Sequence, residues 1–124
     1  DINRGIEKIF KKLHNLIPKN PHPTLLHGDL WQGNILYKNE QVVGLIDPGS
    51  VYGHNEMEIA YLRFFNEELY NDKFLDQYSE ANHIDKDFFS YELIYRIYFS
   101  LMNILSWNRA YIKDVRYLLK KVRL

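Results

Sequence analysis

The chain has 124 residues, of which 46% are hydrophobic and 15% aromatic, so we expect a folded protein with a core rather than a disordered one. Sixteen Lys and Arg residues balance sixteen Asp and Glu residues, which excludes the basic excess typical of nucleic-acid binders. The absence of cysteine excludes disulfides and thiolate metal sites, and no apolar run has membrane-spanning length. We therefore expect a cytoplasmic protein without a nucleic-acid or membrane partner.

A helix is predicted at the start of the chain, where apolar residues recur at helical spacing: Ile6, Ile9, Phe10, Leu13 and Ile17. A cluster of prolines between residues 18 and 23 ends this helix. Residues 24–26 then form a short buried approach to a glycine-containing turn. Beyond the turn, residues 35–37 and 41–46 are predicted to pair as a hairpin around residues 38–40.

The rest of the chain is predicted to be helical. The predicted helices cover residues 55–65, 71–78, 87–107 and 111–122. Asp85 or Asp87 is expected to cap the longest of them. That helix carries a stripe of aromatic and apolar side chains, which we interpret as a packed core face rather than as a ligand wall. The predicted fold class is α+β, mainly α-helical, with one small β-hairpin.

The residues around the hairpin are the most informative in the chain. Residues 27–34 read HGDLWQGN, and an apolar run ends at Asp47, thirteen residues after Asn34. Protein kinases place a proton-accepting Asp, then a Mg²⁺-binding Asn five positions later, then a second Mg²⁺-binding Asp at the end of a strand. Asp29, Asn34 and Asp47 fit that order and are expected to gather at one end of the hairpin. The alternative is an ordinary turn between two buried strands, and the joint occurrence of the three groups favours the kinase interpretation.

Phosphoryl transfer gives this spacing a physical reason, because it requires positioning and charge neutralisation more than covalent chemistry. One carboxylate must meet the acceptor hydroxyl, and Asp29 fits this role. Mg²⁺ prefers hard oxygen ligands and keeps several waters, so the amide of Asn34 and the carboxylate of Asp47 are a sufficient protein share. Gly28 and Gly33 allow the tight backbone angles of the loop between them.

HGDLWQGN at residues 27–34, followed by LIDPGSVYGHNEMEIA at residues 45–60, resembles the fructosamine (ketosamine) kinases. This family is a branch of the aminoglycoside phosphotransferase-like enzymes, which share the protein-kinase fold. Trp31, Pro48 and residues 52–56 carry the resemblance to this branch in particular. The resemblance implies the C-terminal lobe of a protein-kinase-like fold, in which the hairpin carries the catalytic and metal-binding loops.

Residue by residue, the resemblance implies that Asp29 accepts the proton of the attacking sugar hydroxyl. It implies that Asn34 and Asp47 hold Mg²⁺ against the phosphates of ATP. Trp31 is expected to form a wall against the sugar, and core packing is the alternative for its side chain. His27 is expected to orient the loop through hydrogen bonds rather than to take part in the chemistry.

His54, Glu56 and Glu58 are expected to support the same loop structurally. The chain departs from the family at Glu58, where members usually have an Asp whose carboxylate braces the catalytic loop. It departs again at residues 49–51, Gly-Ser-Val, where a small residue and a Tyr are usual after the proline. The second departure is expected to alter the acceptor pocket.

The activity that the resemblance implies is ATP-dependent phosphorylation of a sugar hydroxyl of a ketosamine, which is a sugar joined to an amine by glycation. A second hypothesis is a kinase acting on an aminoglycoside or a choline-type amino alcohol. An acidic acceptor pocket would favour those cationic substrates, and the candidate carboxylates are Glu56, Glu58, Glu67 and Glu68. A third hypothesis is a binding module that keeps the fold without the chemistry.

Kinases also need a phosphate-covering loop, a strand Lys and a helix Glu before the catalytic loop, and only 26 residues precede His27. We therefore expect residues 1–124 to be the catalytic-loop lobe alone, without the N-terminal nucleotide-binding lobe, and to be inactive by themselves. The lobe-facing surface, including the residues before Thr24 and parts of the hairpin, is expected to expose apolar groups and to promote self-association.

Overall fold

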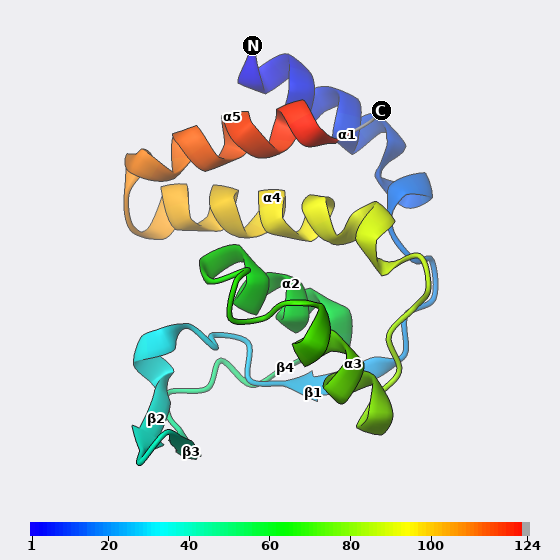
Figure 1. The fold of residues 1–124 in the computed structure, drawn as a ribbon. Coiled ribbons are helices and arrows are strands. Elements are labelled where there is room, and N and C mark those ends of the chain that lie inside the picture. Colours follow the sequence, from blue (N-terminus) through cyan, green and yellow to red (C-terminus); the bar gives the residue numbers. More distant parts are fainter. Residues whose placement is uncertain (123–124) are drawn as a thin grey trace. The chain divides into compact units, whose positions relative to one another are not determined.

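The computed structural model describes residues 1–122, which form two compact units (Figure 1). Within the described residues, the helical unit comprises residues 1–20 and 85–122, and the mixed unit comprises residues 21–84. Helices predominate, and the described residues contain two antiparallel strand pairs. No helix in this part of the chain is long and apolar enough to cross a membrane. The helix-rich fold class predicted from the sequence is confirmed.

Three helices build the helical unit and pack along one another (Figure 1): α1 (Ile2–Leu16), α4 (Phe88–Ser106) and α5 (Ile112–Lys121). The short helix η2 (Arg109–Tyr111) joins α4 to α5. Aliphatic side chains from all three helices form a core of Ile9, Ile94, Ile97 and Leu118. Burying one such side chain stabilises a fold by about 1.5–3 kcal/mol, so this core contributes to the stability of the unit.

The helix starts in this unit follow capping rules only in part. Asp1 caps α1, because its Oδ1 accepts a hydrogen bond from the backbone N–H of Asn3 at 3.2 Å. Asp87 stands at the N-cap position of α4, but its side chain makes no capping hydrogen bond. Asp85 instead accepts from the backbone N–H of Asp87 at 2.8 Å and closes the turn before the helix. The predicted position of the cap is confirmed, and the predicted capping interaction is wrong.

The apolar faces predicted for α1 and α4 are also partly wrong. Phe10 is 76% exposed, because its neighbour Ile9 takes the inward position and successive helical residues point about 100° apart. In α4, Phe88 and Tyr91 are buried, whereas Leu105 is 81% exposed. The packed-core interpretation of this helix is therefore confirmed at its beginning and wrong at its end.

Two strand pairs and two longer helices make up the mixed unit. β1 (Pro23–Leu26) pairs with β4 (Val51–His54), and β2 (Ile35–Lys38) pairs with β3 (Gln41–Leu45). The helix α2 (Asn55–Phe65) contacts both β1 and β4, and α3 (Asp72–Ala81) follows it. The strand β4 is not predicted from the sequence, because four residues interrupted by Gly53 give too short a pattern without their partner strand.

Burial along β1 follows the alternation of a strand rather than the predicted buried approach. Leu26 is buried, and Leu25 is 61% exposed, because successive strand residues face opposite sides. The predicted hairpin is confirmed, and it turns at Asn39 and Glu40, whose φ angles of 51° and 62° fit a type I′ turn. The strand β3 ends one residue earlier than predicted, at Leu45.

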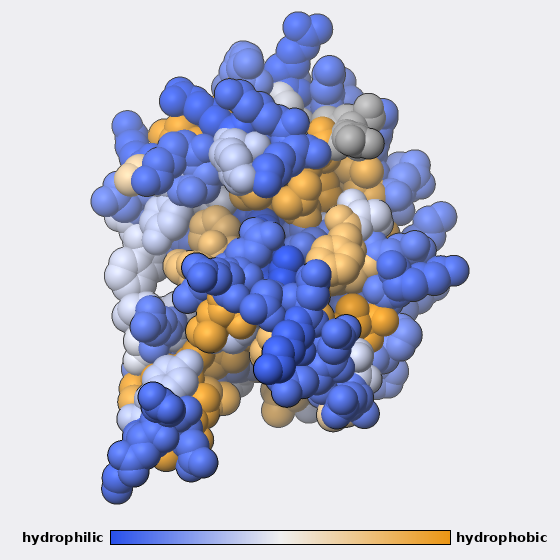
Figure 2. Space-filling model, viewed as in Figure 1, coloured by the Kyte–Doolittle hydropathy of each residue, from blue (hydrophilic) through white to orange (hydrophobic). Residues whose placement is uncertain are grey.

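The β2–β3 hairpin exposes apolar side chains on both strands. The exposed members are Leu36, Tyr37, Val42, Val43 and Leu45. Figure 2 shows this apolar surface beside hydrophilic residues at the lower left, where Figure 1 places the hairpin. The hairpin therefore carries an apolar surface that the described residues do not cover.

Candidate functional site

The turn after β1 carries Asp29 and depends on the glycine before it. Gly28 has a φ of +82°, in the region that side chains rarely adopt. A Cβ at this position would lie 2.7 Å from Cγ1 of Val51 on β4. Both the backbone angle and the close approach of β4 require glycine here, so the backbone of the turn can pack directly against β4.

His27 ties this turn to the segment that follows β3. Its Nδ1 accepts a hydrogen bond from the backbone N–H of Asp29 at 3.3 Å, and its Nε2 lies 2.8 Å from the carbonyl oxygen of Ile46. The neutral ring with its proton on Nε2 satisfies both contacts. The backbone carbonyl of His27 also accepts from the N–H of Ser50 at 3.0 Å. The His27 ring thus joins the turn to the residue before Asp47.

Glu58 braces the same turn from the first turn of α2. Its Oε1 accepts from the backbone N–H of Gly28 at 2.7 Å, and its Oε2 accepts from that of His27 at 3.2 Å. A carboxylate that receives two backbone N–H groups makes strong charge-assisted hydrogen bonds. The family that the sequence resembles usually has aspartate at this position. The glutamate found here still reaches the backbone of the turn.

The carboxylate of Asp29 is held at both oxygens. Its Oδ1 accepts from the hydroxyl of Tyr61 at 2.9 Å, and its Oδ2 lies 3.3 Å from Nδ2 of Asn34. The same amide nitrogen donates to the carbonyl oxygen of Asp29 at 2.9 Å. Asn34 is buried, and it belongs to the short helix η1 (Gln32–Asn34) that precedes β2. The fold therefore brings Asp29 and Asn34 into direct contact.

Asp47 follows β3 and comes directly after a residue that contacts the backbone of Asn34. The N–H of Ile46 donates to the carbonyl oxygen of Asn34 at 3.0 Å, so Asp47 is one residue from a backbone contact with Asn34. Asp47 itself has a φ of +50°, an uncommon conformation that Asp tolerates better than most residues. Its exposed carboxylate accepts no hydrogen bond from the described residues.

The donor set suits Mg²⁺ better than a transition metal. The hydrogen bonds of Asn34 direct its amide nitrogen at Asp29, which leaves its oxygen without a hydrogen-bond donor among residues 1–122. An amide oxygen and the carboxylate of Asp47 are hard ligands of the kind that Mg²⁺ prefers. In the same range, no group of three His, Cys, Asp or Glu side chains gathers to hold a metal. The residues present thus fit an ion that takes few protein ligands and keeps several waters.

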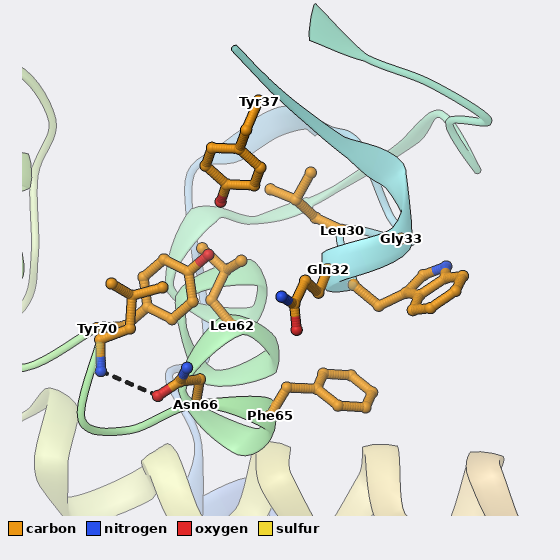
Figure 3. A pocket seen from close by; sticks show the side chains of 10 residues that line it. Leu30, Gln32, Gly33, Tyr37, Leu62, Phe65, Asn66 and Tyr70 are labelled. Atoms are coloured by element: carbon orange, nitrogen blue, oxygen red, sulfur yellow. Dashed lines mark hydrogen bonds between the residues drawn. The ribbon is translucent and has the colours of Figure 1, made fainter. Parts of the chain in front are cut away.

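A cavity of about 590 Å³ opens beside the turn, between η1, β2 and the end of α2 (Figure 3). Its lining comprises Leu30, Trp31, Gln32, Gly33, Tyr37, Leu62, Phe65, Asn66, Leu69 and Tyr70. None of these side chains is charged. The mixture of aromatic rings with amides and hydroxyls suits a neutral, hydroxyl-bearing ligand group.

Trp31 lines this cavity and is not a core residue, because it is 41% exposed. Its ring lies against Gly33, where an added Cβ would stand 2.1 Å from the ring atom Cη2. Glycine at position 33 therefore leaves room for the Trp31 ring. Among the described residues, the Trp31 side chain is not packed in a core.

The hydroxyl groups of Tyr37 and Tyr70, two residues that line the cavity, point toward one another (Figure 3). Burial, together with the neighbouring hydroxyl of Tyr37, raises the pKa of Tyr70 to about 12. The Tyr70 hydroxyl therefore stays neutral at physiological pH. These two tyrosines and Tyr61 are not predicted as site residues from the sequence, because no local pattern distinguishes them from the other seven tyrosines of the chain.

His54 and Glu56 lie where β4 passes into α2. Nε2 of His54 is 3.2 Å from Oε2 of Glu56, whose side chain is fully buried. The next residue, Asn55, donates through Nδ2 to the hydroxyl of Tyr78 at 3.3 Å and to the carbonyl oxygen of His83 at 2.8 Å. These contacts fix the start of α2, the helix that presents Glu58 and Tyr61 to the turn.

Comparison with known proteins gives consistent matches. A "Probable ketoamine kinase" from Enterococcus faecium is 31% identical over 92% of the chain and 39% of its own length. Another from Staphylococcus aureus is 32% identical over 98% of the chain and 45% of its own length. A chloroplastic protein-ribulosamine 3-kinase from Arabidopsis thaliana is 38% identical over 54% of the chain and 24% of its own length. The chain therefore spans less than half the length of these relatives.

The fold is also found in a solved structure. A crystal structure from Thermobifida fusca, named "putative fructosamine-3-kinase", matches with a TM-score of 0.77 and 24% identity over 96% of this chain and 41% of the other. The family model described as fructosamine kinase matches residues 2–124. The chain belongs to the fructosamine kinase family.

Proposed function

We propose that the full-length protein carrying this chain transfers the γ-phosphoryl group of ATP to a sugar hydroxyl of a ketosamine. The observation that carries the proposal is the Asp29 carboxylate, which the turn, Tyr61 and Asn34 fix in one orientation. The acceptor oxygen forms a bond to the γ-phosphorus while the bond from that phosphorus to the β–γ bridging oxygen breaks. The hydroxyl proton passes to Asp29, and ADP leaves.

Asn34 and Asp47 are the residues that would hold Mg²⁺ in this reaction. When bound, the ion neutralises charge on the phosphates of ATP. Asn34 offers its amide oxygen because its nitrogen is engaged by Asp29. Asp47 projects a free carboxylate from a left-handed backbone position next to the β3 strand. His27 joins the turn to the segment before Asp47, and Glu58 joins the turn to α2. These contacts support the positions of Asn34 and Asp47.

The uncharged cavity supports a sugar acceptor over the strongly cationic aminoglycosides. Three of the four candidate carboxylates have other partners. Glu56 is buried beside His54, Glu58 binds the backbone of the turn, and Glu67 lies 3.5 Å from Arg63. Among the described residues, Glu67 and Glu68 do not line the cavity. Trp31 offers an apolar ring face to a sugar at the same place.

We infer that this chain serves as the catalytic-loop lobe and that the exposed apolar hairpin faces a nucleotide-binding lobe. Leu36, Val42, Val43 and Leu45 support this, since apolar surface of this kind is usually an interface. Residues 1–124 alone should then self-associate and fail to transfer phosphate. Sedimentation velocity and a coupled ATPase assay check both points, and a monodisperse monomer that transfers phosphate would contradict them.

The proposed function is tested by ATP consumption with three acceptors. The full-length protein is given fructosyl-lysine, an aminoglycoside or choline, and ADP release is coupled to a spectroscopic readout. We expect turnover with fructosyl-lysine and a much lower kcat/KM for the two cationic acceptors. Preference for the aminoglycoside or choline would assign a different acceptor class. Absence of turnover with all three, in protein that binds Mg²⁺·ATP, would support a non-catalytic binding module.

A further inference from the structure

Tyr61 contacts the Asp29 carboxylate and takes no part in the bond changes described above. The residue lies in the middle of α2, is 9% exposed, and donates its hydroxyl to Oδ1 of Asp29 at 2.9 Å. Its ring packs edge-on against Phe65, with the ring centroids 5.0 Å apart. A phenylalanine would fill the same volume and keep the ring contact. The hydroxyl is thus the part of Tyr61 that forms the hydrogen bond to Asp29.

The helix α2 controls the turn at two levels. Glu58 binds the backbone N–H groups of His27 and Gly28, and Tyr61 binds the side chain of Asp29. These two residues are three positions apart, so they lie on one face of the helix. One helix face therefore sets both the path of the turn and the direction of the carboxylate.

We propose that Tyr61 is a positioning residue for the phosphoryl transfer, an inference that rests on the proposed function. Its hydroxyl holds Oδ1 of Asp29, and Oδ2, whose contact with Asn34 is the longer one at 3.3 Å, accepts the proton of the acceptor hydroxyl. Tyr61 itself neither gains nor loses a proton. The bond changes at phosphorus and the departure of ADP are those already described.

The expected effect follows from the freedom of an aspartate side chain. The terminal torsion of Asp is broad, so a carboxylate needs hydrogen bonds to keep one orientation. Without the Tyr61 hydroxyl, the 3.3 Å contact with Asn34 is the hydrogen bond that remains to the carboxylate among those described. A misdirected base lowers the rate of the chemical step and leaves nucleotide binding intact, because Asn34 and Asp47 are unchanged.

The test is Tyr61→Phe in the full-length protein, with steady-state kinetics on ATP and fructosyl-lysine. We expect kcat to fall roughly 10-fold, the value of one lost hydrogen bond to a charged group, with KM for ATP within twofold of wild type. Tyr117→Phe is the control, because Tyr117 is a 57% exposed tyrosine of α5 in the helical unit. The control should retain wild-type kcat.

The Asp29→Asn background separates positioning from a general structural role. If Tyr61 acts through Asp29, adding Tyr61→Phe to Asp29→Asn should change the residual turnover less than twofold. An unchanged kcat in Tyr61→Phe, or a further 10-fold loss in the double variant, would overturn the role of Tyr61. These outcomes differ from failure of the proposed function, in which the wild-type protein itself shows no turnover with fructosyl-lysine.

Discussion

The two units are stabilised by different means. The helical unit is organised around aliphatic side chains, with Ile97 and Leu118 among its most buried residues. The mixed unit holds its turn with charge-assisted and side-chain hydrogen bonds, and it contains every residue with a positive φ among those described. Substitutions in the helical unit should therefore change stability alone. Substitutions in the mixed unit should change stability and chemistry together, because the same bonds serve both.

Asp47→Asn should have the largest effect on ligand binding. Asparagine tolerates the left-handed backbone at this position, so the fold is retained while the negative charge is lost. We expect the variant to lose Mg²⁺-dependent nucleotide binding. Isothermal titration of Mg²⁺·ATP into the full-length variant measures this, and unchanged affinity would show that other groups hold the ion.

Glu58→Gln should affect stability and rate together. The amide nitrogen of glutamine would face a backbone N–H that now donates to the carboxylate, so one of the two hydrogen bonds is lost. We expect the free energy of unfolding to fall by about 1–3 kcal/mol and kcat to fall with it. Urea denaturation and steady-state kinetics on the same preparation are the measurements. A lower stability with wild-type kcat would show that the hydrogen bonds of Glu58 support the fold without affecting the rate of phosphoryl transfer.

Ile97→Val provides the contrasting case in the helical unit. Ile97 is 3% exposed in the aliphatic core, and loss of one methylene there should lower the free energy of unfolding by about 1 kcal/mol. Urea denaturation should show this loss. kcat and KM, measured well below the denaturation midpoint, should match wild type. Altered kinetics in a fully folded preparation would contradict the division of roles between the units.

Gly33→Ala should produce the smallest effect. The added methyl group would meet the ring of Trp31, so the ring must move away from η1. We expect KM for fructosyl-lysine to rise a few-fold with little change in kcat. In residues 1–124 by themselves, the exposed Trp107 can be replaced by Phe so that the fluorescence spectrum reports Trp31. An unchanged spectrum and KM would remove Trp31 from acceptor binding.

The sequence predicts the helices because their apolar periodicity is a local property of the chain. It also identifies Asp29, Asn34 and Asp47, since the motif places them at short, fixed spacings along one turn and one hairpin. The structure shows that Asp29 and Asn34 are in contact and that Asp47 is one residue from a backbone hydrogen bond to Asn34. The chemical roles of these residues remain predictions.

The features that the sequence does not predict depend on distant contacts. The strand β4 exists through its pairing with β1, and neither strand is long enough to be recognised alone. Tyr61 reaches Asp29 across 32 positions, and the cavity combines η1 and β2 with residues at and beyond the end of α2. Exposure of Phe10 and Leu105 likewise depends on which helix faces find a partner. The periodicity of apolar residues predicts which residues share one face of a helix, but it does not predict which element packs against that face.

The most direct test of the account is Asp29→Asn in the full-length protein, because the mixed unit arranges its hydrogen bonds around this carboxylate. Asparagine keeps the size of the side chain but cannot accept the proton of the acceptor hydroxyl. Single-turnover phosphoryl transfer from Mg²⁺·ATP to fructosyl-lysine should slow by roughly 10²-fold or more, with unchanged affinity for Mg²⁺·ATP. Transfer at the wild-type rate would contradict the assignment of Asp29 as the proton acceptor.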